Sequence, residues 1–408
     1  MFVLSHIDNN SCYKEHVLTY QIILESIGEI ELEIEDLVEI VEGKTKLLVP
    51  KDSLSVNAPP KQPAFFNPRA RISRDFSIIA YSTFLQNFKG PKIFLDSLAG
   101  IGAHSIRVAN EIESIEQVFA NDVNPSAIEI AMRAAKLNKG TKCDFSENEA
   151  CRFLSSHSKR DTRGAIVDID PFGSPTRFLD CGIRATSHGG LLSITATDLP
   201  VLHGLYQDAC KRKYYGVPVK TEYGNEIAIR LILGCIHLVA GRLDVQIVPL
   251  FVQTNMHYYK VYVKVLVRTD SQENMGYIVH CKSCGHRKVQ NEKEFSCEIC
   301  STKLDSAGPL WIGNLYDKAF VNQMLEEQKK FLVDKSCEKT LLKCQNEICM
   351  PGTYFTLDEI ARKKRCAPIS LSKIIEKLQK DGFQVSQTSL DPSGFRTNAR
   401  IDKILQIF

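Results

Sequence analysis

Between residues 90 and 268 the chain alternates between two hydrophobic patterns. Short apolar runs rich in β-branched residues are typical of buried parallel strands, and the longer segments between them are typical of helices. Three predicted strands end at Asp96, Asp122 and Ser146, and two more span 164–169 and 189–197. The predicted helices span 126–138, 178–187 and 226–240. This alternation predicts an α/β fold with a parallel, doubly wound sheet. Strands at 244–251 and 260–268 are predicted to close the sheet as a hairpin.

The first sixty residues have strand periodicity. Apolar and acidic side chains alternate over residues 29–35, and residues 38–50 form a second stretch with Gly43 near its middle. This pattern predicts a strand followed by a β-hairpin. Pro59, Pro60 and Pro63 then predict an extended link to the sheet domain.

From about residue 276 the pattern changes to two C-x-x-C pairs. Cys281 and Cys284 are separated from Cys297 and Cys300 by twelve residues. This spacing predicts a zinc ribbon in which four thiolates hold a structural ion tetrahedrally. A redox dithiol would need one pair beside a thioredoxin-like unit, and His286 is a spare candidate ligand.

The remaining segment alternates helical and strand patterns. An amphipathic helix is predicted around 320–333, a second helix begins near 356–361, and a third spans 370–381. A strand at 382–385 follows. The order helix, turn, helix, strand predicts a small winged-helix-like or α+β module.

Composition narrows the class of protein. With 408 residues the chain is long enough for two or three domains, and a net charge of +3 does not by itself indicate a polyanionic partner. Basic residues do cluster at 69–74, 211–213 and 362–365. Each cluster is either a solvated face or a nucleic-acid contact, and the sequence alone leaves both interpretations open. No apolar run approaches the roughly 20 residues that span a bilayer, so no membrane partner is expected.

Fourteen cysteines without a secretory signal indicate a reducing, intracellular setting. Cys181, Cys210 and Cys235 lie in apolar segments and are predicted to be small buried hydrophobes. The acidic stretch 25–42 argues against a mitochondrial presequence. Residues 362–365 are a short basic cluster, which is either a nuclear signal or an edge that faces RNA. The expected location of the protein is the nucleus in a eukaryote and the cytoplasm otherwise.

The segment Asp170-Pro171-Phe172-Gly173-Ser174-Pro175 follows the apolar strand 164–169. Open α/β sheets bind ligands at the carboxyl ends of their strands. A carboxylate, a carbonyl held by proline and an aromatic ring match the needs of a planar base with an amino group. The alternative is an ordinary strand-to-loop junction in which Asp170 caps the next helix.

Two other strand ends carry acids beside small residues. Asp96 precedes the turn Ala99-Gly100-Ile101-Gly102, and Asp122 ends the next strand about twenty residues later. An acid at this offset is placed to accept hydrogen bonds from ribose hydroxyls, which indicates an adenosine-containing cofactor. Alternatively, Asp122 and Asn124 cap the helix that begins at Pro125. Glu149 is a candidate for the adenine edge or a simple helix-start acid.

Together these stretches resemble the tRNA guanine-N2 dimethyltransferase family, whose members modify guanosine 26 of tRNA. The shared motifs are Phe66-Asn67-Pro68 with Arg74-Asp75, Ser105-Ile106-Arg107, Asn121-Asp122, the segment 170–175, Thr195-Ala196-Thr197-Asp198, the cysteine pairs, Gly308-Pro309-Leu310-Trp311-Ile312-Gly313 and Asp391-Pro392-Ser393-Gly394. The first glycine turn and Glu149, which stands where Asp is more usual, depart from the family pattern.

The resemblance implies a Rossmann-like class I methyltransferase domain and a smaller α+β C-terminal domain with a zinc ribbon. The expected limits are 1–60 for an N-terminal hairpin extension of the catalytic domain, 61–275 for the S-adenosylmethionine-binding domain and 276–408 for a zinc-binding, tRNA-binding domain. S-adenosylmethionine is the expected methyl donor. Its site would be lined by Arg74, Arg107, Asp122, Glu149 and Ala150, with Asp96 a further candidate from the strand before the glycine turn.

The resemblance also implies a catalytic role for Asp170, Pro171 and Phe172. Asp170 and a neighbouring carbonyl would accept hydrogen bonds from the guanine N2 amine, and Phe172 would stack on the flipped base. One or two methyl groups would be transferred, and tRNA would be held through phosphates and shape. An obligate protein partner is not expected.

Two other classes of function remain open on the sequence alone. One is an amino-methyltransferase that acts on another RNA guanosine, DNA adenine or a protein amide. The other is a non-catalytic tRNA-binding protein that kept the fold.

Overall fold

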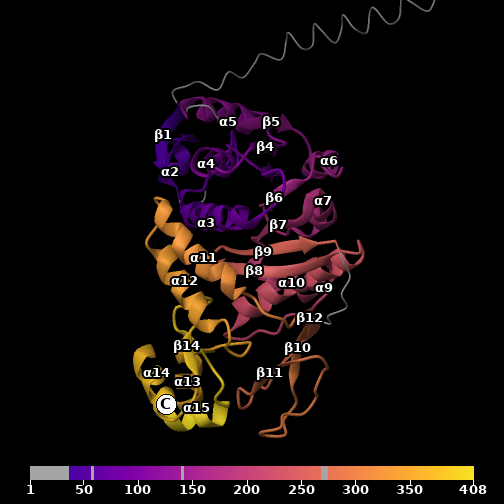
Figure 1. Cartoon of the computed structure of the whole chain (residues 1–408). Coiled ribbons are helices and arrows are strands. Elements are labelled where there is room, and N and C mark those ends of the chain that lie inside the picture. Colours follow the sequence, from indigo (N-terminus) through magenta and orange to yellow (C-terminus); the bar gives the residue numbers. More distant parts are fainter. Residues whose placement is uncertain (1–35, 57–58, 139–141, 268–273) are drawn as a thin grey trace, which may run out of the picture. The chain divides into compact units, whose positions relative to one another are not determined.

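The centre of the computed structural model is a seven-stranded sheet of order β5-β4-β3-β6-β7-β9-β8 (Figure 1). Its strands are β3 (Ile93–Asp96), β4 (Gln117–Asp122), β5 (Cys143–Glu147), β6 (Gly164–Ile169), β7 (Thr186–Ala196), β8 (Gln246–Asn255) and β9 (Tyr258–Leu266). β9 runs antiparallel to its neighbours β7 and β8, and the pairings from β5 to β7 are parallel. The strand order reverses between β3 and β6, which is where such sheets bind ligands. The structure describes residues 36–56, 59–138, 142–267 and 274–408.

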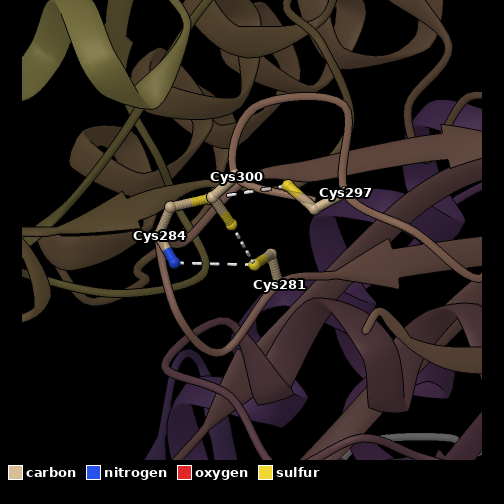
Figure 2. Close-up of side chains that lie close together, drawn as sticks. All are labelled: Cys281, Cys284, Cys297 and Cys300. Atoms are coloured by element: carbon tan, nitrogen blue, oxygen red, sulfur yellow. Dashed lines mark hydrogen bonds between the residues drawn. The ribbon is translucent and has the colours of Figure 1, made fainter. Parts of the chain in front are cut away.

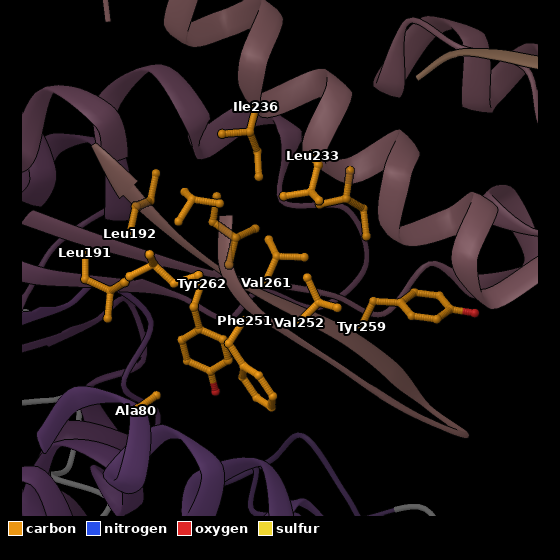
Figure 3. Close-up of a cluster of buried hydrophobic side chains, with 14 of the residues drawn as sticks. Ala80, Leu191, Leu192, Leu233, Ile236, Phe251, Val252, Tyr259, Val261 and Tyr262 are labelled. Carbon is orange, nitrogen blue, oxygen red and sulfur yellow. The ribbon is translucent and has the colours of Figure 1, made fainter. Parts of the chain in front are cut away.

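Helices cover both faces of this sheet, as the doubly wound prediction requires. They are α3 (Arg71–Asn87), α4 (Ala103–Glu111), α5 (Pro125–Leu137), α6 (Ala150–Ser156), α7 (Leu179–Ala185) and α10 (Gly224–Gly241), with the short α2 (Asp52–Ser55), η2 (Pro68–Ala70), η3 (Thr176–Phe178), α8 (Leu199–Leu202) and α9 (Gln207–Tyr214) between them. Figure 3 shows Leu233 and Ile236 of α10 on one face of the sheet. On the other face Phe251 and Tyr262 point towards Ala80 of α3.

Helix α10 is a core helix. Its 18 residues have a mean hydropathy of 1.3, so length and composition alone would let it cross a membrane. However, 72% of it is buried inside the protein, and Glu226 and Arg230 on it form an ion pair 2.8 Å long. Burial on both sides explains its apolar sequence without a bilayer.

The predicted N-terminal hairpin is confirmed, with β1 (Leu37–Glu42) paired to β2 (Thr45–Pro50). Gly43 at its turn has φ +58°, and a Cβ there would lie 2.4 Å from the carboxylate of Glu111. Glycine is therefore required both by the turn and by the close packing on α4. The predicted strand at 29–35 lies outside the described residues.

A second sheet consists of β10 (Met275–His280), β11 (Arg287–Gln290) and β12 (Asp305–Trp311) in the antiparallel order β11-β10-β12. β12 packs directly against α10. A Cβ on Gly234 of α10 would lie 3.2 Å from the Cα of Leu310 and 3.1 Å from the backbone nitrogen of Trp311. The sequence Gly308-Pro309-Leu310-Trp311 therefore belongs to the contact between this sheet and the core helix.

The C-terminal residues form a third, small α+β module, as predicted. Its sheet has the order β13-β15-β14, from β13 (Phe355–Thr356), β14 (Val385–Gln387) and β15 (Gly394–Thr397), and its helices are α13 (Leu357–Lys364), α14 (Leu371–Lys380) and α15 (Ile401–Ile407). Ile360, Ile374, Phe395 and Ile404 make a separate apolar core. The strand expected at 382–385 begins only at Val385.

Three helical segments precede this module. The helix predicted at 320–333 is α11 (Lys318–Glu327) continued by η4 (Gln328–Lys330), and α12 (Ser336–Glu347) was not predicted. α11 and α12 pack against each other and against α3. Ser82 of α3 donates a hydrogen bond of 2.7 Å to the buried carboxylate of Glu327, which joins the C-terminal half to the sheet domain.

A buried ion network joins α10, α12 and β15. Arg396 of β15 donates from Nε to Glu347 (2.5 Å) and from Nη1 to Glu226 (3.0 Å). Arg230 donates to the carbonyls of Trp311 and Gly313, both at 3.0 Å. Separating these segments would leave buried charges without partners, which is costly. The network therefore holds the three segments in fixed positions relative to one another.

Candidate functional site

The predicted acids lie at the carboxyl ends of neighbouring strands. Asp96 ends β3 and Asp122 ends β4, and Asp170 follows β6. Two further acids lie at this edge, because Asp168 is in register with Asp96 and Glu147 with Asp122. The buried amide of Asn121 joins the loops that follow these strands. It donates to the carbonyls of Ser97 (3.2 Å) and Asn148 (2.9 Å).

Asp122 organises the glycine turn. One carboxylate oxygen accepts from the backbone nitrogen of Gly100 (2.8 Å) and the other from that of Asn124 (2.9 Å). Gly100 has φ +54°, and the nearest atom to a Cβ at this position would be the carbonyl oxygen of Phe65, 3.7 Å away. The turn is therefore open on this side, and the carboxylate of the partly exposed Asp122 retains acceptor capacity for ribose hydroxyls.

The alternative role in helix capping is filled by Asn124. Its side chain accepts from the backbone nitrogen of Ser126 at 3.1 Å, at the start of α5. Glu149 likewise caps α6, where one carboxylate oxygen accepts from the nitrogen of Arg152 (3.0 Å), so its helix-start role is confirmed. Glu149 is exposed and Ala150 behind it is buried. Contact of either residue with adenine stays a prediction.

Arg74 and Arg107 lie in one ion-pair cluster. Arg74 binds both carboxylate oxygens of Glu42 (2.6 and 2.8 Å), and Arg107 is fully buried between Asp75 (2.7 Å) and Glu111 (2.9 Å). These pairs raise the pKa of Arg107 even though burial opposes its charge. Arg107 is thus saturated by protein carboxylates and fixes α3 against α4, and its direct contact with a cofactor stays a prediction.

Asp96 lies deeper than the other candidates. It is 2% exposed and accepts a hydrogen bond from Ser105 Oγ (2.5 Å). Burial and the nearby charge of Asp168 raise the pKa of Asp96 to about 8. Its carboxyl group therefore binds the first turn of α4 to the end of β3, and a direct cofactor contact of Asp96 stays a prediction.

The loop after β6 is held rigidly to the end of β7. Gly173 has φ +82° and donates to Thr197 Oγ1 (2.6 Å), while the nitrogen of Thr197 donates to the carbonyl of Gly173 (2.9 Å). The next helix, η3, has Pro175 as its N-cap residue, without a side-chain hydrogen bond. Asp170 is therefore not the capping residue of this helix, and the alternative reading of the loop is wrong on this point.

Asp170 and Phe172 both reach solvent from this loop. Phe172 is 61% exposed, its ring meets Phe65 edge to face at 4.8 Å between centroids, and Lys61 Nζ lies 4.9 Å from its centroid. More than half of the Phe172 side chain is thus exposed, two residues after Asp170, and is available for stacking. Desolvation by the surrounding protein atoms and the nearby charge of Asp168 raise the pKa of the Asp170 carboxyl group, and the charge of Lys260 opposes this shift.

A buried charge cluster lies below the loop, and sequence reasoning did not identify it. Asp168 is completely buried and accepts from Tyr81 Oη (2.8 Å), Lys260 Nζ (3.0 Å) and His104 Nδ1 (3.1 Å). Burial alone would raise the pKa of Asp168, but Lys260 and His104 hold it below the usual range. The available signal was a lysine inside the apolar run Tyr258-Tyr259-Lys260-Val261-Tyr262.

The four predicted metal ligands come together (Figure 2). The Sγ atoms of Cys281, Cys284, Cys297 and Cys300 all lie within 4.8 Å of one another. Cys281 and Cys300 are 3.5 Å apart, and Cys284 and Cys297 are 3.6 Å apart. Thiolates around a tetrahedral zinc at about 2.3 Å lie about 3.8 Å from one another, so the geometry fits a structural zinc with no open position.

Each cysteine pair forms a tight turn of the same kind. Gly285 (φ +86°) donates to the carbonyl of Cys281, and Ser301 (φ +58°) donates to that of Cys297, both at 2.8 Å. His286, the spare candidate, has its Nε2 3.5 Å from Glu298 Oε1. The donor set is therefore complete with four thiolates.

Cys181 is buried, as predicted, and it also forms a disulfide with Cys151, with the two Cα atoms 5.6 Å apart. Its partner lies on α6 and could not be identified from an apolar local sequence. Cys210 and Cys235 are free and buried, as predicted.

Comparison with known proteins agrees over nearly the whole chain. A family model described as N2,N2-dimethylguanosine tRNA methyltransferase matches residues 43–408. A tRNA (guanine(26)-N(2))-dimethyltransferase from Methanobrevibacter smithii is 32% identical over 381 residues, which cover 90% of this chain and 96% of the relative. A tRNA (guanine(26)-N(2)/guanine(27)-N(2))-dimethyltransferase from Aquifex aeolicus is 31% identical over 382 residues, which cover 90% and 95%.

A solved structure extends the agreement to the fold. Trm1 from Pyrococcus horikoshii, in complex with S-adenosyl-L-methionine, matches with a TM-score of 0.79 at 28% identity, covering 91% of this chain and 99% of that one. The predicted fold class, a Rossmann-like methyltransferase domain with a zinc-ribbon-bearing C-terminal part, is therefore confirmed. The resemblance inferred from the motifs is confirmed as well.

We predict that replacing Cys281 and Cys284 together by Ser removes the zinc and lowers the melting temperature, because the ribbon folds around its ion. Metal content of the purified protein and a thermal melt measure both effects. Cys366→Ser, a change at an exposed free thiol, is the control and should leave both unchanged. Metal-free wild-type protein with the same melting curve as the double variant would contradict a structural zinc.

We predict that Lys260→Met destabilises the protein by about 3–5 kcal/mol, because Asp168 would keep a buried charge without its partner. Denaturant unfolding measures the change in free energy. Lys264→Met on the same strand, at a partly exposed position, is the matched control and should cost far less. Equal losses in the two variants would show that the pair with Asp168 has no special weight.

Proposed function

Because the chain belongs to the N2,N2-dimethylguanosine tRNA methyltransferase family, we propose that it methylates the exocyclic N2 amine of guanosine 26 in tRNA, with S-adenosylmethionine as methyl donor. Up to two methyl groups are transferred. The observation that carries this proposal is the rigid Asp170-Pro171-Phe172 loop at the carboxyl edge of the sheet, beside an open glycine turn governed by Asp122. An acceptor and an exposed ring there match an amino-bearing base.

The cofactor site follows from the strand ends. Bound S-adenosylmethionine supplies an electrophilic methyl group. Asp122 accepts from the ribose hydroxyls, the turn at Gly100 admits the donor closely, and Glu149 with Ala150 borders the adenine. Arg74, Asp96 and Arg107 act on this site through the protein partners by which they hold β1, β3, α3 and α4 together.

Asp170 and Pro171 orient the nucleophile. The lone pair of the guanine N2 amine is delocalised into the ring, so the nitrogen is a poor nucleophile in its planar form. Hydrogen bonds from this amine to the Asp170 carboxylate and to the Pro171 or Phe172 carbonyl favour a tetrahedral nitrogen whose lone pair faces the methyl group. The same fixed acceptors stabilise the positive charge that develops on the nitrogen as the methyl group leaves the donor sulfur. The Asp170 carboxylate is placed to accept the N–H proton that the methylated nitrogen then releases.

Phe172 completes the base pocket. Because the amine is out of reach inside a stacked helix, the guanosine must leave its stack. The exposed ring of Phe172 offers a replacement stacking partner, held in place by Phe65. After the first transfer, the monomethylated base can rotate or rebind to accept a second group.

The C-terminal part is proposed to hold the body of the tRNA. Residues 276–408 would bind phosphates, residues 61–275 would carry the catalytic site, and residues 1–60 would extend it. The basic cluster at 362–365 lies in α13 and the turn that follows it, with Arg362 66% exposed. We place the enzyme inside the cell, in the nucleus of a eukaryote and in the cytoplasm otherwise, without a membrane or an obligate protein partner.

We predict that the enzyme labels an unmodified tRNA transcript from labelled S-adenosylmethionine, and that digestion yields dimethylguanosine. A transcript with adenosine in place of guanosine 26 should remain unlabelled, because its base lacks the N2 amine. A guanosine 27 variant tests the second position named for the Aquifex aeolicus relative. Equal labelling of the wild-type and guanosine 26 variant transcripts would support methyl transfer to tRNA but contradict guanosine 26 as the modified position.

We predict that Asp170→Ala lowers kcat by about 10²–10³-fold, the usual cost of removing a preorganised polar group from a transition state, while cofactor and tRNA binding stay nearly unchanged. Asp180→Ala, at an exposed aspartate of α7, is the control. A wild-type enzyme should also lose activity on acidification at a pH above that expected for an ordinary aspartate, because the pKa of Asp170 is raised and its ionised form is the stronger acceptor and the one that stabilises positive charge. Loss of tRNA or cofactor binding by Asp170→Ala would indicate a structural role instead.

A further inference from the structure

Residues 204–215, which begin just after α8 and include α9, expose several large apolar side chains. Leu205 is 70% exposed, Tyr206 57% and Tyr215 48%. Contiguous exposed apolar groups mark binding surfaces, and Leu205 and Tyr206 line one hollow. The mechanism described above does not use these side chains.

This segment is bonded to the catalytic loop. Tyr214, the last residue of α9, is buried and donates from Oη to the Asp198 carboxylate (2.6 Å). The same Oη accepts from Ser174 Oγ of the loop (3.1 Å). Since Asp198 follows β7 and Ser174 follows β6, α9 is fixed at the edge of the sheet where the methylated base is proposed to bind.

The chemistry of the segment is aromatic and basic. A hollow of about 480 Å³ is lined by Leu205, Tyr206, Arg212 and also by Asp208. Lys211 and Arg212 are exposed on α9, and Lys213 reaches Asp198 at 3.3 Å. Stacking side chains beside positive charges are the features by which proteins hold single-stranded nucleic acid.

We propose that residues 204–215 form a docking surface for the unstacked nucleotides next to the methylated guanosine, with Tyr206 stacking on a base and Arg212 binding a phosphate. The inference rests on the proposed function. When the target base leaves its stack, the neighbouring bases lose a partner, and a stacking surface bonded to the catalytic loop offers them another. The occupant is therefore the tRNA substrate and not a peptide.

The first test is a set of Tyr206 variants assayed on tRNA. Tyr206→Ala is expected to raise the KM for tRNA by about tenfold, within the range of one lost base stack, with the KM for S-adenosylmethionine unchanged. Tyr206→Phe keeps the ring and should stay near wild type. An equal effect of the two variants, or a matching rise in the KM for S-adenosylmethionine, would overturn the stacking role.

The second test measures the salt dependence of tRNA binding. Arg212→Ala should lower the slope of log K against log salt by about 0.7, the contribution of one single-strand phosphate contact. Arg160→Ala removes an equal charge from an exposed loop before β6, at the opposite edge of the sheet, and should leave the slope unchanged.

The outcomes separate this inference from the proposed function. Methyl transfer by wild-type enzyme with unchanged tRNA binding in Tyr206→Ala and Arg212→Ala would reject the docking surface and leave the activity standing. Absence of transfer by the wild-type enzyme to any tRNA would reject the activity itself. Weaker tRNA binding in both variants, with normal melting curves, is the result that supports the docking surface.

Discussion

The ion pair between Asp168 and Lys260 is the interaction on which the centre of this sheet depends. It joins the last position but one of β6 to β9, across the intervening strand β7. A carboxylate in this position is costly to bury, and Lys260, Tyr81 and His104 together offset that cost. The loop that carries Asp170 starts two residues after Asp168. The buried ion pair therefore helps to fix the position of this loop.

The strand ends could be predicted from the sequence because each buried parallel strand is a short apolar run. A polar residue at the carboxyl end of the sheet follows or ends each run. Asp96, Asp122 and Asp170 were therefore located correctly at one edge. The cysteine spacing likewise located the zinc ligands, because a tetrahedral thiolate site needs two tight turns. Both signals are local.

The partners that could not be predicted are those joined across long stretches of chain. Lys260 is 92 residues after Asp168, and Arg396 is 170 residues after Glu226, so neither pair leaves a local pattern. The family resemblance implied a cofactor contact for Arg107, and its carboxylate partners Asp75 and Glu111 could not be read from the local sequence. The disulfide of Cys181 escaped for the same reason: its partner is on another helix.

The antiparallel strand β9 enters the sheet late in the chain, and this has a consequence for the order of synthesis. A nascent chain that has reached β7 already contains Asp168 and Asp170 but lacks the lysine that compensates the buried carboxylate. Because domains generally fold as units during synthesis, the carboxyl edge of the sheet lacks this counter-charge until residue 260 has left the ribosome. The sheet therefore closes only when the hairpin of β8 and β9 is added, and the buried Asp168 carboxylate gains its lysine partner in that step.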